Sequence, residues 1–241
     1  MNLPDINKVL FMDIETVPQY ETFSEAPEVL QRLFVQKFKN KTSEVQKAIT
    51  KDEIWEEMWN LKAPLFAEFG KIVCISIGML HNGKFITKNF ASENEFELLK
   101  KFTSGKTLEK FSDISGQNSF ICVYNGENFD LPFIAKRLII NGLNVPKAFF
   151  FPDLKPWERN FIIDIKNIWK WDVYDGAISL GLLGVALGLQ IHKEEMDGSM
   201  VKDVYYVEKN IKKIADYCDK DIYLLYQVYD KLSLIKVANP I

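Results

Sequence analysis

The chain has 241 residues, of which 47% are hydrophobic and 26% are charged, and its formal net charge is −3. This composition is typical of a soluble globular protein, and the length allows one well-buried domain or two small ones. The negative charge argues against a protein that coats nucleic acid through a basic surface. It does not argue against a nuclease, because a metal site needs a cluster of acids.

The cysteines and the apolar segments indicate a cytoplasmic protein. Cys74, Cys122 and Cys218 lie far apart in apolar stretches and have no metal or redox spacing, so we expect reduced core residues. The N-terminus has no basic region followed by a long apolar one, which predicts that there is no signal peptide. The apolar run at 178–191 is too short to span a bilayer as a helix, so we expect no membrane contact.

The first predicted strand, at 8–15, carries two acids, Asp13 and Glu15. Side chains alternate along a strand, so these two carboxylates should share one face. The opposite face would carry Leu10, Met12 and Ile14. Adjacent carboxylates raise each other's pKa, and a divalent cation would relieve both their repulsion and the cost of burial. The alternative is an edge strand whose acidic face lies in water.

Residues 21–68 are predicted to form a helical insertion. Within it, Thr50 and Glu53 have the spacing of a capping box at the start of a helix. A buried strand at 71–80 follows the insertion.

A hairpin and a helix come next. The dipeptide Asn82-Gly83 predicts a tight turn between the strand at 71–80 and its partner at 84–91. The helix at 92–102 is expected to begin at Ser92, with Glu95 completing a capping box.

The second half of the chain alternates between strands and helices. We predict a strand at 119–126, a helix at 131–143 closed by Gly142, a strand and then a helix at 161–169, and helices at 179–189 and 210–232. This order suits one sheet covered by helices, in a single domain over 1–241 with the helical insertion at about 21–68.

The last predicted helix places one acid toward the interior. At 100° per residue, Asp221 falls inside the apolar stripe, and Tyr217 lies one turn before it on the same face. Asp216 and Asp219 should lie on the wet face, where Asp216 can pair with Lys220. The alternative for this helix is one acid at the rim and a core tyrosine.

A further acidic motif lies where the strand at 119–126 meets the following helix. Asn125, Phe129 and Asp130 form the pattern N-x-x-x-F-D, at a position where α/β sheets display functional loops. The alternative role of Asp130 is a simple helix N-cap. Asp164, in the apolar run FIIDI, is interpreted as structural or as a residue that supports a metal ligand.

Taken together, these segments resemble a known family. FMDIETVP, YNGENFDLPFIAKR and YCDKD look like the three motifs of the DEDD exonucleases in the tyrosine-bearing subclass. The likeness is greatest to the stand-alone 3′–5′ exonucleases related to the proofreading domain of B-family DNA polymerases. The resemblance implies an α/β, RNase H-like fold with a central mixed sheet flanked by helices on both faces.

The resemblance also implies roles for the acids. Asp13 would bridge two divalent metal ions, Mg²⁺ or Mn²⁺, with Glu15 and Asp221 completing the ligands of the first. Asp130 would hold the second ion. Tyr217 would orient the attacking water. A purely carboxylate set suits these hard ions, whereas Zn²⁺ usually recruits histidine or cysteine.

The expected substrate contacts also follow from the resemblance. Asn125 would touch the terminal nucleotide, Phe129 would support it or stack near it, and the main chain at Ile14 and Thr16 would meet the 3′ end. Phe129 could equally be a core residue.

We therefore expect a 3′–5′ exonuclease acting on single-stranded ends, with DNA favoured over RNA. A 3′–5′ exoribonuclease is the alternative within the same chemistry. An aspartyl phosphatase is a rival because D-I-E-T echoes D-x-D-x-T, but Glu15 stands where that mechanism needs an aspartate. A non-catalytic nucleic-acid-binding module is less favoured because all four acids are present. The sequence does not indicate an oligomeric state.

Overall fold

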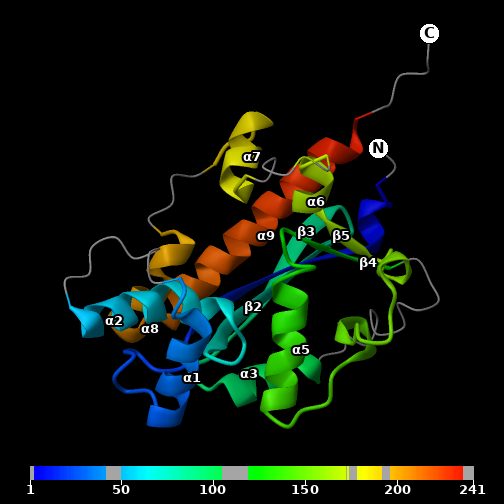
Figure 1. Ribbon diagram of the computed structural model, residues 1–241. Helices are drawn as coiled ribbons and strands as arrows, with labels where there is room; N and C mark the ends of the chain where they lie inside the picture. Colours follow the sequence, from blue (N-terminus) through cyan, green and yellow to red (C-terminus); the bar gives the residue numbers. More distant parts are fainter. Residues whose placement is uncertain are drawn as a thin grey trace.

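The computed structural model describes residues 3–41, 50–104, 119–171, 173, 178–191 and 196–235 (Figure 1). Its centre is a five-stranded mixed sheet in the order β3-β2-β1-β4-β5. The strands are β1 (Val9–Pro18), β2 (Gly70–His81), β3 (Lys84–Ala91), β4 (Phe120–Val123) and β5 (Ile162–Asp164). Strand β1 pairs antiparallel with β2 and parallel with β4. It is therefore the middle strand, and the edge-strand alternative is wrong.

Helices cover both faces of the sheet (Figure 1). One face packs against α3 (Glu95–Thr103) and α5 (Asp130–Ile140). The other face packs against α6 (Ile165–Trp169), α7 (Leu180–Ala186), α8 (Val201–Tyr206) and the long α9 (Ile211–Ser233). Short 3₁₀ helices occupy Ile6–Lys8, Ala63–Leu65, Lys147–Phe149, Pro156–Glu158 and Gly198–Met200. The α/β architecture with a mixed sheet between helices is as predicted.

The alternation along β1 places the acids on the α9 side. Leu10, Met12 and Ile14 pack in the core beneath α3 and α5, whereas Phe11 packs against α9. Asp13 and Glu15 follow Phe11 on that second face, where they lie across from Ser76 and Cys74 of β2. The prediction that the two carboxylates share one face is confirmed.

Helices α1 (Glu28–Phe38) and α2 (Lys51–Lys62) form the expected helical part of 21–68 and lie near α8 in Figure 1. Their contact is aromatic: the ring centroids of Phe34 in α1 and Trp59 in α2 lie 4.9 Å apart. The Phe34 ring also lies 5.1 Å from that of Phe69, just before β2. The capping box of Thr50 and Glu53 is present at the start of α2. The division into one domain with an insertion stays a prediction.

The turn that follows β2 is as predicted, whereas the start of the next helix is not. Asn82 and Gly83 have φ of 51° and 74°, the left-handed geometry that a tight hairpin turn needs at both positions. Helix α3, however, begins at Glu95 and is capped by Asn94, so the predicted Ser92 cap is wrong.

The reason is a buried ion pair. The Glu95 carboxylate accepts hydrogen bonds from Arg137 Nε at 2.9 Å and from the Ile72 N–H at 2.7 Å. Both charged side chains are buried, and a buried guanidinium needs a paired carboxylate. Because the Glu95 carboxylate pairs with Arg137 of α5, it is not available for the capping box predicted with Ser92.

The remaining elements match the predicted order with shifted ends. Strand β4 stops at Val123 because Asn125 adopts φ of 63°, which extended backbone does not allow. Helix α5 ends before Gly142, whose φ of 68° is the left-handed geometry of a helix end. Among the described residues, no helix is long and apolar enough to cross a membrane.

Candidate active site

Three elements bring the four predicted acids together. Asp13 and Glu15 lie on β1, Asp130 opens α5, and Asp221 lies on α9. The Asp130 carboxylate accepts a hydrogen bond from the Ile14 N–H at 3.1 Å, between the two acids of β1. The charges of Asp130 and Asp221 both raise the pKa of Asp13. The four carboxylates therefore form one electrostatic cluster.

Burial and mutual repulsion make this cluster unfavourable without a cation. Burial raises the pKa of Asp130 to about 7. It also raises the pKa values of Asp13 and Glu15 well above their usual range, and neighbouring carboxylates push both further. The Glu15 side chain is only 8% exposed, and no hydrogen bond or ion pair from the described residues reaches its carboxylate.

A divalent cation fits this donor set. A buried carboxylate without a donor is costly, and coordination to a cation replaces the lost hydration. Oxygen donors are what Mg²⁺ and Mn²⁺ prefer. The structure thus supports the expectation that these residues hold metal. The observation that favours a metal is the Glu15 carboxylate, which receives no hydrogen bond or ion pair from the described residues.

Tyr217 lies one helical turn before Asp221, as predicted, and its phenol is close enough to the Asp221 carboxylate for that charge to act on it. Burial and the charge of Asp221 raise the pKa of Tyr217 well above its ordinary value. The phenol therefore keeps its proton at neutral pH and can act as a hydrogen-bond donor.

Hydrogen bonds to the Asp164 side chain stabilise the turn between β4 and α5. This buried carboxylate accepts from the N–H groups of Asn125 at 2.8 Å and Glu127 at 3.2 Å, and also from the Lys166 N–H at 3.0 Å. A Cβ at Gly126 would lie 2.9 Å from Asp130 Oδ2, so this close approach requires glycine. Asp164 therefore supports the segment that presents Asn125.

The other residues of the motif take defined positions. Asp130 is the first residue of α5 and Phe129 precedes it as the N-cap, so the N-cap alternative for Asp130 is wrong. Phe129 is half-buried, with its ring centroid 5.4 Å from that of Phe133. The Thr16 hydroxyl donates to the Pro64 carbonyl at 2.8 Å, and Thr16 lies opposite Ile72 of β2.

Asp219 has partners that the prediction for α9 did not include. It is half-buried beside the surface pocket, and its carboxylate accepts hydrogen bonds from Ser76 Oγ and from Asn89 Nδ2, both at 2.7 Å. Helix α9 crosses the β2–β3 hairpin. The polar side chains of Ser76 and Asn89 therefore reach Asp219, which the helical wheel places off the apolar stripe. Asp216 is exposed, as predicted.

Cys218 is a site residue that the sequence analysis missed. Its Sγ lies 3.5 Å from Asp13 Oδ2, and its thiol is fully buried. The spacing contained a signal, because Cys218 stands three residues before Asp221 and so shares its helix face. The expectation of a free, buried cysteine is confirmed, for this and for the other two.

A family profile, described as "Predicted 3'-5' exonuclease related to the exonuclease domain of PolB", matches residues 65–238. The chain belongs to this family. The match includes Asp130, Tyr217 and Asp221, whereas Asp13 and Glu15 precede it. In the structure, the hydrogen bond from Ile14 to Asp130 joins these two parts of the chain.

Similar proteins include DNA polymerases and a glucanotransferase. The chain is 27% and 26% identical over 183 residues to DNA polymerases of Thermococcus litoralis and Thermococcus aggregans, covering 67% of this chain and 10% of each polymerase. It is 22% identical over 190 residues to a 4-alpha-glucanotransferase of Thermotoga maritima, covering 74% of this chain and 40% of that protein. The chain thus spans less than half the length of each of these relatives.

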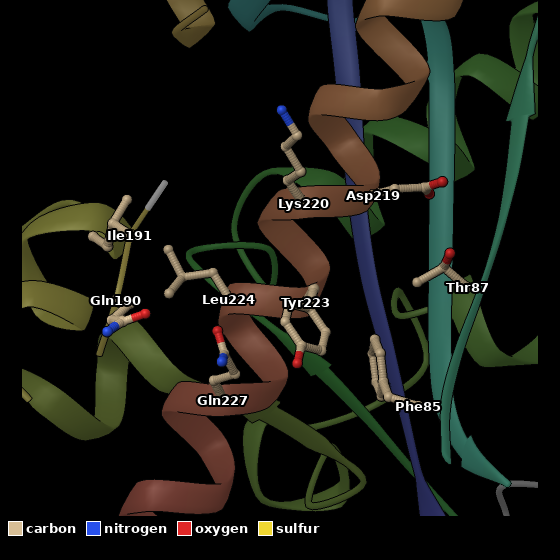
Figure 2. Close-up of a pocket in the computed structure, with 9 residues that line it drawn as sticks. All are labelled: Phe85, Thr87, Gln190, Ile191, Asp219, Lys220, Tyr223, Leu224 and Gln227. Atoms are coloured by element: carbon tan, nitrogen blue, oxygen red, sulfur yellow. The ribbon is translucent and has the colours of Figure 1, made fainter. Parts of the chain in front are cut away.

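A surface pocket of about 440 Å³ lies outside the acidic cluster, across the outer face of α9 (Figure 2). Lys220, Tyr223 and Gln227 of α9 stand between β3 on one side and Gln190 and Ile191 on the other. None of the four acids lines this pocket. The acidic cluster and this pocket therefore lie at different places around α9.

Proposed function

We propose that this protein is a metal-dependent 3′–5′ exonuclease that removes nucleotides from the 3′ end of single-stranded nucleic acid, with DNA favoured over RNA. The convergence of Asp13, Glu15, Asp130 and Asp221 beside Tyr217, in a chain of this family, is the observation that carries the proposal. The likeness to two DNA polymerases supports DNA as the substrate.

The assignment of metal ligands follows the resemblance to the DEDD exonucleases, and the mutual electrostatic effects of the four acids support it. Asp13 would be shared by the two ions. Glu15 and Asp221 would help to hold the first ion, and Asp130 would hold the second. Bound Mg²⁺ or Mn²⁺ would supply an activated water and neutralise charge on the leaving oxygen.

Tyr217 positions the attacking water in this proposal. Its hydroxyl stays protonated and is close enough to Asp221, Glu15 and Asp13 for their charges to act on it, so it can donate to a water held at these acids. Asn125, held by Asp164, contacts the terminal nucleotide. Phe129 and the main chain at Ile14 and Thr16 complete the contacts to the 3′ end.

Two further expectations belong to the proposal. The chain acts as one domain over 1–241, with the helical insertion at about 21–68 beside the sheet. Three free, buried cysteines support a reducing compartment, the cytoplasm.

The decisive experiment uses short single-stranded DNA and RNA labelled at the 5′ end, incubated with the full chain and Mn²⁺. A ladder that shortens from the 3′ end, stops with EDTA and is absent in Asp13→Ala supports the proposal. The relative rates on DNA and RNA decide the preferred substrate. Binding without cleavage would make the chain a non-catalytic module, and turnover of a small phosphomonoester with intact nucleic acid would favour the phosphatase; both outcomes contradict the proposal.

A further inference from the structure

A thiol lies inside the carboxylate cluster. Cys218 Sγ is 3.5 Å from Asp13 Oδ2 and 3.7 Å from the Asp13 carbonyl oxygen. One donor atom each from Asp13, Glu15 and Cys218 lie within 4.8 Å of one another. These three residues therefore offer two oxygens and one sulfur to a single point.

An independent observation indicates that this point attracts a cation. The Glu15 side chain is more than nine-tenths buried, and its carboxylate receives no hydrogen bond or ion pair from the described residues. The backbone of β1 and its pairing with β2 hold this carboxylate beside Asp13. The Glu15 carboxylate thus lacks a positive partner at the place where the sulfur converges.

The spacing of sulfur and oxygen suits a small thiophilic ion. Zn–O bonds of about 2.1 Å and Zn–S bonds of about 2.3 Å, at a tetrahedral angle, put the two donor atoms about 3.6 Å apart. The observed separation of Cys218 Sγ and Asp13 Oδ2 is 3.5 Å. Mg²⁺ would leave the sulfur unused, whereas thiolate ligation selects softer ions.

We propose that Asp13, Glu15 and Cys218 form an alternative site for thiophilic ions, in which Zn²⁺ or Cd²⁺ is held by two carboxylates and one thiolate. The sulfur–metal bond forms as the S–H bond breaks, and the proton passes to solvent. Because Asp13 and Glu15 are also the assigned ligands of the first catalytic ion, the two modes exclude each other. This consequence rests on the proposed function, whereas the binding of the soft ion does not.

The other two cysteines provide internal comparisons. Cys122 is buried in β4 among apolar side chains on the α9 side of the sheet. Cys74 pairs with Glu15 across the strands and adjoins Cys218, but its Sγ is not one of the three donor atoms that converge within 4.8 Å. Only one of the three thiols is therefore expected to bond to the ion.

The test is a titration of the metal-free full chain with Cd²⁺, followed by the ultraviolet charge-transfer absorption of a cadmium–thiolate bond. We expect this absorption in the wild type and in Cys122→Ser, and its loss in Cys218→Ser. The Kd for Cd²⁺ in Cys218→Ser should rise about tenfold or more. Zn²⁺ should compete with Cd²⁺ for the wild-type site, and Glu15→Gln should weaken Cd²⁺ binding while keeping the thiol.

Several outcomes would overturn the proposal: no absorption in the wild type, absorption that persists in Cys218→Ser, or absorption lost in Cys122→Ser alone. If Cys218→Ser does not fold, as judged by its circular dichroism, the Glu15→Gln titration decides. Nuclease assays separate the two proposals. Cleavage with Mn²⁺ but no cadmium–thiolate absorption overturns only the soft-ion site, whereas absorption without any cleavage overturns only the exonuclease assignment.

Discussion

The Asp130 carboxylate receives the backbone N–H of Ile14 at 3.1 Å, although 116 residues separate the two in sequence. Ile14 stands between Asp13 and Glu15 in the middle strand of the sheet, and Asp130 is the first residue of α5. This one bond ties the start of a helix to the strand that carries two other acids. Three carboxylates are thus brought together by the protein itself, before any ion is bound.

Substitutions of Asp130 should separate its two roles. Asp130→Asn keeps an oxygen acceptor for the Ile14 N–H but removes the charge, whereas Asp130→Ala removes both. We expect both variants to lose cleavage by about 10³-fold, because one proposed metal ligand is gone. Only the alanine variant should lose about 1–3 kcal/mol in the free energy of unfolding, since it leaves a buried N–H unpaired. Urea denaturation alongside the cleavage assay measures both, and equal stability of the two variants would contradict the hydrogen-bond role.

Tyr217→Phe should reduce turnover without disturbing the metal. Loss of the hydroxyl removes a proposed donor to the attacking water, so kcat should fall by about 10²-fold. The affinity for Mn²⁺ should stay unchanged, because Tyr217 is not an assigned ligand. Tyr205→Phe is the matched control, since the Tyr205 hydroxyl donates to the Glu93 carbonyl and not to any of the four acids. Full activity in Tyr217→Phe would refute the proposed role.

Local periodicity was sufficient to predict much of this site. The two-residue repeat of a strand put Asp13 and Glu15 on one face, and the structure confirms this by their positions opposite Ser76 and Cys74. The 100° step of a helix put Tyr217 one turn before Asp221, and the charge of Asp221 acts on the Tyr217 phenol. Both inferences depend only on geometry within one element, which the sequence determines directly.

Residues whose partners come from distant elements were not predictable in this way. Asp219 was assigned to water because the helical wheel does not include the β2–β3 hairpin that α9 crosses. Glu95 matched a local capping pattern, yet it pairs with Arg137 of α5. Cys218 was predicted to be a core residue. Its spacing relates it to Asp221 on the same helix, but the contact of its thiol with Asp13 depends on how α9 packs against β1.

The bonds of Asp219 should contribute to stability and not to metal binding. Asp219→Ala leaves Ser76 Oγ, in a fully buried residue, without its acceptor, so we expect the free energy of unfolding to fall by about 1–3 kcal/mol. Asp216→Ala is the matched control on the same helix, and its exposed side chain should change stability by no more than about 0.5 kcal/mol. Chemical denaturation of both variants measures this difference, and equal stabilities would show that the contacts to β2 and β3 contribute nothing.

Asp164 should act on substrate through the turn that it holds. Its two carboxylate oxygens accept three N–H groups, and an Asn side chain keeps only one of those oxygens. Asp164→Asn should therefore loosen the turn at Asn125 and raise KM by about tenfold, with a smaller change in kcat. Asp153→Asn, on an exposed residue, is the control and should match the wild type. A fall in kcat with an unchanged KM would point to a different role.

The stability of the metal-free protein should decrease as the pH rises. Folding raises the pKa of Asp130 from 3.8 to about 7 and raises those of Asp13 and Glu15 in the same direction. A carboxyl group with a raised pKa binds more protons in the folded state than in the unfolded state. The protonated Asp130 carboxyl therefore contributes fully to the free energy of unfolding below pH 3.8, and this contribution is lost as the pH rises through about 7.

Thermal melts of the EDTA-treated protein between about pH 5 and pH 8 measure this effect. We expect Tm to fall across this interval, and the fall to be smaller in Asp130→Asn, which has no carboxyl group to ionise there. Asp216→Asn, which alters an exposed acid, should melt like the wild type at each pH. Added Mn²⁺ should raise Tm most at the upper end, because the ion binds the deprotonated carboxylates. A Tm that rises with pH in the metal-free protein would mean that the fold stabilises these acids in their charged form, and the argument for a missing cation would then fail.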